Sequence, residues 1–228
     1  MMSRALGAAL AVGGLCASTQ AAVFFTFEDP GSGPEITYTE GTDNNSDPGV
    51  LSYTGAQVNL IVDGNDEGLG TINYSASLEM EILIGAVEGE INNILSAPIL
   101  GGSFTFTNRT EGDNGGDVIL SGSMTNGGLL TLNTVGALIA TSTTAGLTMQ
   151  EGPVLAAFLG GSELAPTFDI SFTLTNISPG TTKNQENFIT SFTANSAFTG
   201  NANVIPTPGT ALLASASFSL LATRRKRG

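Results

Sequence analysis

Apolar and polar residues alternate one by one along much of this chain, most regularly over residues 71–84. Every even position of that stretch is apolar, and every odd position is polar except Leu83. Successive side chains of a β-strand point to opposite faces, so a period of two indicates a strand with one buried and one wet face. The residues expected on the buried face include Ile72, Tyr74, Leu78 and Met80.

Shorter stretches repeat this alternation at 103–108, 169–176 and 187–198. Phe and Ile hold many of their apolar positions, and Thr recurs at the polar ones, which is a composition that suits strands. Four further residues are therefore expected to be buried: Phe104, Phe106, Ile170 and Phe172.

Glycine, asparagine and proline separate the expected strands. The triplet Asn126-Gly127-Gly128 stands between apolar runs at 118–124 and 129–132, and it predicts a hairpin turn. A helix of one or two turns is expected at 154–159. About ten strands with so little helix indicate a mainly β fold. We expect one antiparallel domain over residues 22–205, a β-sandwich similar to a jelly roll.

The N-terminus has the three parts of a secretory signal peptide. Arg4 supplies the positive charge, residues 5–16 the apolar region, and Thr19-Gln20-Ala21 a cleavage site of small residues. An uncleaved anchor is the alternative, but the apolar run is short for one. A lipoprotein signal is disfavoured because no small residue directly precedes the cysteine. We expect residues 1–21 to be removed, which leaves Ala22 as the first residue.

The C-terminus, residues 206–228, combines a proline turn, an apolar run and a basic end. The apolar run Ala211–Ala222 would form a helix about 18 Å long, which is short for a hydrocarbon core of about 30 Å. Flanking residues lengthen it, and basic side chains reach the interface and hold the segment on the cytoplasmic side. We expect a short transmembrane helix; a buried core helix with a solvated basic end is the alternative. The proline turn contains Pro206, Thr207 and Pro208, and the basic end consists of Arg224, Arg225, Lys226 and Arg227.

This tail resembles the PEP-CTERM sorting signal of bacteria, which a membrane enzyme called exosortase processes. Pro206 and Pro208 match the prolines of that signal, Thr207 stands where the family has Glu, and residues 224–227 match its Arg-rich end. The sequence Ile-Pro-Thr-Pro-Gly-Thr is similar to planctomycete variants of the signal. The resemblance covers about a tenth of the chain. It implies export through the inner membrane, transient anchoring, processing by an exosortase-type enzyme, and deposition at the cell surface or in an exopolysaccharide matrix.

Composition narrows the chemistry of the body between these ends. The body has no His, Trp or Cys, and Arg109 and Lys183 are its basic residues against 20 acidic ones. Such a surface repels nucleic acid and attracts divalent cations, although acidity by itself also keeps a secreted protein soluble. Catalytic triads that need His or Cys are excluded. Glu79 and Glu81 have the spacing of a glycosidase pair, but a solvated outer face is the preferred explanation. We predict no catalytic residues and no enzyme activity.

Three acidic loops are candidate calcium sites, because calcium takes several oxygen ligands and flexible loops supply them. Asp63, Asn65 and Glu67 alternate in the preferred loop, Asp43 and Asp47 flank the second, and the third runs from Glu111 to Asp117. The alternative is that Asp, Asn and Gly are simply turn-forming residues.

Two functions stay open at the level of sequence. The first is a non-enzymatic protein of the cell surface or extracellular matrix, delivered by the tail. The second is a polysaccharide-binding module on a β-sandwich, with calcium as a candidate stabiliser. An exposed row of aromatic rings on one sheet face would favour the second, whereas an all-polar surface would favour the first. Fold alone decides neither.

Overall fold

The computed structural model of the protein describes residues 22–28, 30, 33–55, 57–110, 116–141 and 146–205. Within them the chain forms thirteen strands, a turn of 3-10 helix, η1 (Asn65–Glu67), and one short helix, α1 (Pro153–Phe158). The predicted antiparallel β domain and the short helix are confirmed. The strands are β1 (Ala22–Phe27), β2 (Ile36–Thr39), β3 (Gly49–Tyr53), β4 (Val58–Gly64), β5 (Gly70–Ile84), β6 (Gly89–Ile91), β7 (Ile94–Asn108), β8 (Val118–Met124), β9 (Gly128–Leu132), β10 (Val135–Thr141), β11 (Leu147–Glu151), β12 (Glu163–Ser178) and β13 (Phe192–Ile205).

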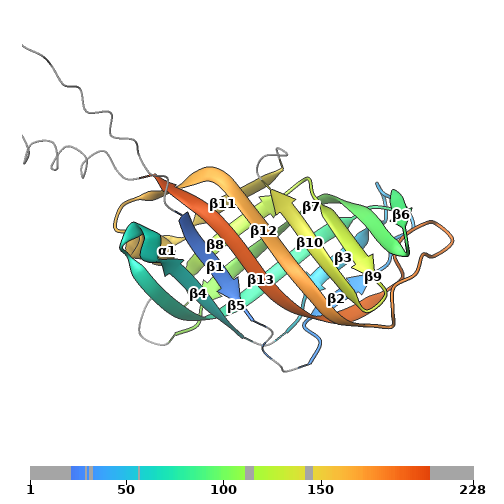
Figure 1. Ribbon diagram of the computed structural model, residues 1–228, viewed down its shortest axis with the longest axis horizontal. Helices are drawn as coiled ribbons and strands as arrows, with labels where there is room; N and C mark the ends of the chain where they lie inside the picture. Colours follow the sequence, from blue (N-terminus) through green and yellow to red (C-terminus); the bar gives the residue numbers. More distant parts are fainter. Residues whose placement is uncertain are drawn as a thin grey trace, which may run out of the picture.

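All the described strands belong to one sheet that closes on itself (Figure 1). From β5 the hydrogen-bonded order runs through β7, β9, β10 and β12 to β13. The sheet then returns to β5 by two routes, because β13 pairs with β1 and with β2, and β5 pairs with β4 and with β3. Strand β8 and its neighbour β11 extend the edge of β7 at the end where β1 and β4 lie. Closure pairs both edges of the long central strands.

The alternation along β5 is the one that its sequence predicts. Even positions from Tyr74 to Ile84 are buried, and Ile72 is partly buried against the same core. The other four residues predicted to be buried, Phe104, Phe106, Ile170 and Phe172, are buried as well. Glu79 and Glu81 are exposed on the outer face, as expected for a solvated strand face.

Five phenylalanines from β1, β7, β12 and β13 form the centre of the core. Ring centroids lie 4.9 Å apart for Phe172 and Phe198 and 5.2 Å apart for Phe106 and Phe198. Phe27 stacks on Phe198 at 5.8 Å, and Phe104 lies 6.2 Å from Phe198. All five rings are almost fully buried. Rings at these distances add aromatic pair energy to the burial of apolar area, so this cluster joins the walls of the closed sheet.

The predicted hairpin at residues 126–128 is wrong. Strands β8 and β9 do not pair with each other; both pair with β7, and their register continues without change from Ser103↔Ser123 to Pro98↔Gly128. The carbonyl of Gly127 even accepts a hydrogen bond from Ile99 N–H, at 3.1 Å. The glycine adopts φ +132° and lets the chain bend without reversing. Pairing with β7 therefore prevails over the local turn signal.

The first and last described strands lie side by side. Ala22 pairs with Asn203, so both ends of the sheet sequence meet at one end of the molecule (Figure 1). The expected signal peptide, residues 1–21, and the expected sorting tail, residues 206–228, lie outside the described residues. No helix in the described part of the chain is long and apolar enough to cross a membrane.

Candidate functional site

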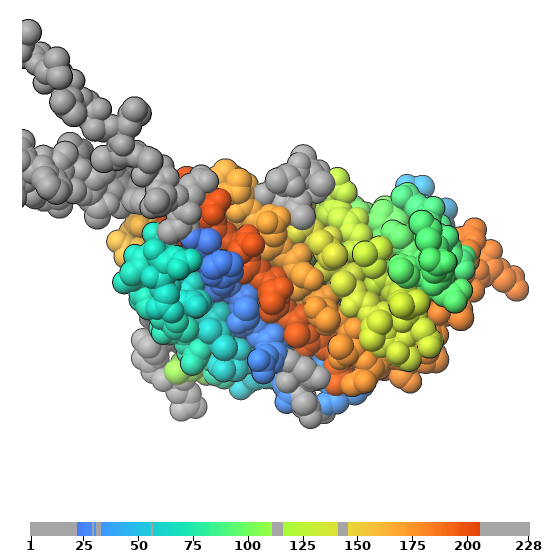
Figure 2. All heavy atoms as spheres, viewed as in Figure 1, coloured from blue at the N-terminus to red at the C-terminus, as the bar shows by residue number. Residues whose placement is uncertain are grey.

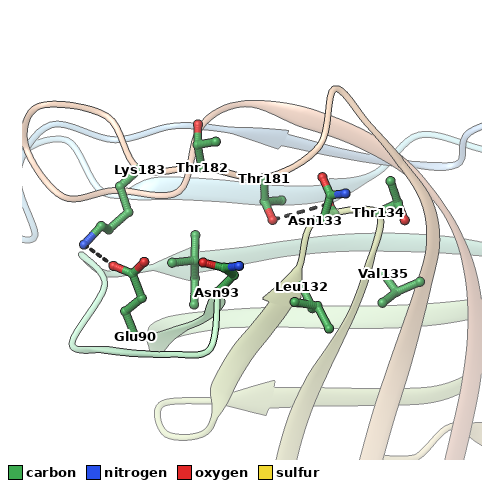
Figure 3. Close-up of a pocket in the computed structure, with 10 residues that line it drawn as sticks. Glu90, Asn93, Leu132, Asn133, Thr134, Val135, Thr181, Thr182 and Lys183 are labelled. Carbon is green, nitrogen blue, oxygen red and sulfur yellow. Dashed lines mark hydrogen bonds and ion pairs between the residues drawn. The ribbon is translucent and has the colours of Figure 1, made fainter.

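An open cleft of about 680 Å³ lies at the end of the molecule away from the paired termini (Figures 1 and 3). Its walls are the β6–β7 hairpin, the β9–β10 turn and the segment that follows β12. In Figure 3 the side chains from these three segments border one open space. The lining residues are Glu90, Asn93, Leu95, Leu132, Asn133, Thr134, Val135, Thr181, Thr182 and Lys183.

Turn geometry places asparagines at two of these walls. Asn93 and Asn133 have left-handed backbones, with φ of 65° and 52°. Asparagine tolerates this conformation better than most residues, which suits it to two-residue hairpin turns. Thr181 N–H donates to the Asn133 carbonyl at 3.0 Å and fastens the segment after β12 to the β9–β10 turn. A side chain at Gly180 would overlap the Asn133 amide, so glycine allows this close approach.

One ion pair crosses the cleft. Lys183 Nζ lies 2.6 Å from Glu90 Oε2, and both side chains are partly exposed. Exposed pairs contribute little stability, typically under about 1 kcal/mol, so this pair matters mainly for the position of the two segments. The other polar lining groups are neutral amides and hydroxyls. Such groups donate to and accept from the hydroxyls of an uncharged, polar ligand.

The first acidic loop uses its carboxylates for its own turn. Asp43 Oδ1 accepts the backbone N–H groups of Ser46 and Asn45, both at 2.9 Å, and the Ser46 hydroxyl at 3.0 Å. The backbone N–H of Ser46, then that of Asn45, lower the pKa of Asp43, because hydrogen bonds favour the charged carboxylate. Asp47 Oδ2 accepts the Thr42 hydroxyl at 2.7 Å. These contacts are those of turn-forming residues.

The preferred calcium loop shows the same kind of contact. Asp63 Oδ1 accepts Asn65 N–H at 3.0 Å and the Thr71 hydroxyl at 3.1 Å, and the Asn65 amide donates to the same hydroxyl oxygen at 2.9 Å. Glu67 ends helix η1, and Gly68 follows it with φ +73°. Within the described ranges, no group of three or more acidic side chains is arranged to hold a metal ion. Calcium stays a prediction for this loop.

The two acidic loops lie far apart. Asp63 pairs with Thr71 near the start of β5, whereas Gly49, which follows the other loop, pairs with Ile84 at its end. The structure therefore does not bring Asp43 and Asp47 together with Asp63, Asn65 and Glu67. The sorting-signal residues, from Pro206 to Arg227, lie outside the described residues.

Sequence reasoning missed the cleft. Asn92-Asn93 and Asn133-Thr134 could have been read as two-residue hairpin turns, whereas residues 181–183 carry no local signal. An exposed row of aromatic rings would have marked a sugar-binding face. Phe24 is the single exposed aromatic residue in the described part of the chain, so the described residues form no such row. No protein-family model, curated protein or solved structure matches this chain.

Proposed function

We propose that this chain is an exported, non-enzymatic protein of the cell surface or extracellular matrix, delivered by an exosortase-type sorting tail. The observation that carries the proposal is the pairing of the first and last described strands. Ala22 of β1 pairs with Asn203 of β13, so the described residues next to the expected signal cleavage site and next to Pro206 lie side by side. Both processing sites would then lie together at one end of the closed sheet, which leaves the cleft at the other end free.

The cleft supports a second candidate, a polysaccharide-binding module. Its neutral amides and hydroxyls suit the hydroxyl groups of a sugar, and it lies at the end that would face away from the membrane. The lack of an exposed aromatic row in the described residues removes the usual stacking platform, so the matrix function is the better supported one. Calcium at Asp63, Asn65 and Glu67 is kept as a proposal, tested by a rise in melting temperature with free calcium.

The sorting tail is tested by changing its two functional parts separately in a host that has the processing enzyme. Replacing Arg224, Arg225, Lys226 and Arg227 with Ser should release or degrade unprocessed precursor, because little else holds a short apolar run in the membrane. Replacing Pro206 and Pro208 with Ala should instead accumulate precursor in the membrane fraction. Proline keeps the preceding chain extended, and a processing enzyme would need that extended segment.

Fractionation with an antibody against the body separates these outcomes. A matched control replaces Arg224, Arg225 and Arg227 with Lys, which keeps the positive charge, and it should be processed as the unchanged chain is. If the Ser and Ala variants are also sorted as the unchanged chain is, the tail is not a sorting signal and the proposal fails.

A further inference from the structure

A hollow of about 370 Å³ lies on the outer face of the sheet, across β1, β13, β12 and β10. Register pairing arranges its outward side chains in two neighbouring rows that cross these strands. The first row contains Phe24, Asn201 and Asp169, and the second contains Thr199, Ser171 and Ile139. We call this hollow the Phe24 trough. Figure 2 shows β1, β13 and β12 side by side on the visible face of the molecule.

Bulky side chains border the trough, and shorter ones form its floor. Phe24 on β1 and Ile139 on β10 stand at opposite sides, and they are 43% and 41% exposed. Between them, β13 and β12 present only hydroxyl, amide and carboxyl side chains on this face. Ligand pockets commonly have volumes of about 300–1,000 Å³, so the hollow is large enough for a small ligand unit. The single exposed aromatic ring of the described residues therefore lies at the edge of a hollow of suitable size.

The polar side chains on the floor are not used by the fold. Two residues further along the same strands, the Asn203 amide donates to the Thr167 hydroxyl at 2.8 Å. By contrast, the side chains of Asp169, Thr199 and Asn201 have no hydrogen-bond partner among the described residues. A carboxylate, a hydroxyl and an amide that lie together can accept from and donate to neighbouring hydroxyl groups of one ligand.

Charge around the trough disfavours an anionic ligand. Asp169 is the single charged residue among the described residues that line the hollow, and Asp63 pairs with Phe24 from the neighbouring strand β4. A phosphate or carboxylate group would meet negative charge there and no basic partner. A metal ion needs several ligands, and the described ranges contain no group of three or more acidic side chains arranged to hold one. The lining therefore favours a neutral ligand that is rich in hydroxyl groups.

We propose that the Phe24 trough binds one neutral sugar unit of a polysaccharide. The C–H groups on one face of the pyranose ring rest on the Phe24 ring, because the face of an aromatic ring carries negative charge density. The hydroxyl groups of the sugar reach Asp169 and Asn201 on the floor. A single ring serves a single sugar unit, so this site needs no row of aromatic residues. The inference rests on the second candidate function, polysaccharide binding, and assigns it a site separate from the cleft.

Native electrophoresis of the full chain in gels that contain a polysaccharide tests the site. Hydroxyethylcellulose, galactomannan and dextran are the neutral probes, alginate is the anionic one, and serum albumin corrects for sieving. At least one neutral gel should slow the unchanged chain, and alginate should not. Phe24→Leu keeps an apolar side chain but removes the ring, so it should weaken apparent affinity by about tenfold, whereas Phe24→Trp should retain it. The matched control is Ile91→Ala, at an exposed apolar position on β6, and it should migrate as the unchanged chain does.

Leu132→Ala, within the cleft, separates the two sites. Loss of slowing in Leu132→Ala but not in Phe24→Leu would place sugar binding in the cleft, so the polysaccharide function would hold and the trough proposal would be wrong. If no neutral gel slows the unchanged chain, the trough and the polysaccharide function are both overturned. Slowing in alginate alone, or equal slowing of Phe24→Leu and the unchanged chain, overturns the trough proposal. None of these variants changes the net charge, and melting curves check that each is folded.

Discussion

At the scale of single residues, the core contains a tyrosine hydroxyl that fits only because a glycine lies beside it. Tyr38 is almost fully buried, and its ring stacks on Phe192 at 5.1 Å. Its hydroxyl has no hydrogen-bond partner among the described residues. A side chain at Gly49 would overlap that hydroxyl, so glycine is needed beside it. Burial, and then the charge of Glu40, raise the pKa of Tyr38 above its ordinary value.

Tyr38→Phe should therefore change stability in a pH-dependent way. At neutral pH the free energy of unfolding should stay the same or rise by up to about 1 kcal/mol, because a buried, unpartnered hydroxyl is removed. The pKa of Tyr38 is higher in the folded than in the unfolded chain. The contribution of neutral Tyr38 to the free energy of unfolding is therefore present below about pH 10 and is lost as pH rises above that value.

Urea unfolding between about pH 8 and pH 11 checks this expectation. The variant should lose less stability than the unchanged chain over the alkaline part of that range. Parallel losses in the two chains would show that Tyr38 does not carry the alkaline destabilisation.

At the scale of elements, β7 contains two adjacent glycines with different roles. Gly102 has φ +140°, and a side chain there would overlap the Glu81 carbonyl and Ile82 on β5. The register between β5 and β7 shifts nearby, at Leu83. Gly101 has no positive φ, and a side chain there would meet open space. Close contact between β5 and β7 therefore requires a glycine at position 102, whereas position 101 does not require one.

Gly102→Ala should lower the free energy of unfolding by about 1–3 kcal/mol, because the new methyl group is strained and crowded. Gly101→Ala is the matched control, and it should change stability by less than about 1 kcal/mol in either direction. Urea unfolding of both variants measures the difference. Equal effects at the two positions would contradict the assigned role of Gly102.

At the scale of the whole molecule, the phenylalanine cluster joins strands that are distant in sequence. Phe198 lies at its centre, with Phe27, Phe104, Phe106 and Phe172 as ring neighbours. The sheet is closed by hydrogen bonds at its edges, and this cluster fills its interior. Loss of the central ring should therefore affect the cooperative stability of the molecule.

Phe198→Ala should lower the free energy of unfolding by about 3–5 kcal/mol, because a large side chain leaves a cavity that its neighbours only partly fill. Phe24→Ala is the matched control, since Phe24 is exposed on the adjacent strand β1. It should cost less than about 1 kcal/mol. Chemical unfolding of the two variants measures the difference, and a similar loss in both would show that the cluster does not dominate the core.

Sequence alone predicted which side chains of β5, β7 and β12 enter the core. A strand alternates its side chains whatever its partner is, so the period of two along 71–84 or 169–176 is a local property. Turn residues were less informative, because their conformation yields to long-range pairing. The triplet at 126–128 continues along β7, and the reversal occurs instead at Asn133-Thr134.

Tertiary structure decided the closure of the sheet, the cleft and the environment of single charges. The pairing of β1 with β13 joins residues at the two ends of the body, and the cleft joins turns from three separate segments. Glu35, an acidic residue that composition would place at the surface, is fully buried, and its Oε2 accepts Ser196 N–H at 3.2 Å. Alternation depends on neighbours along the chain, whereas these features depend on contacts between distant segments, so no local pattern specifies them.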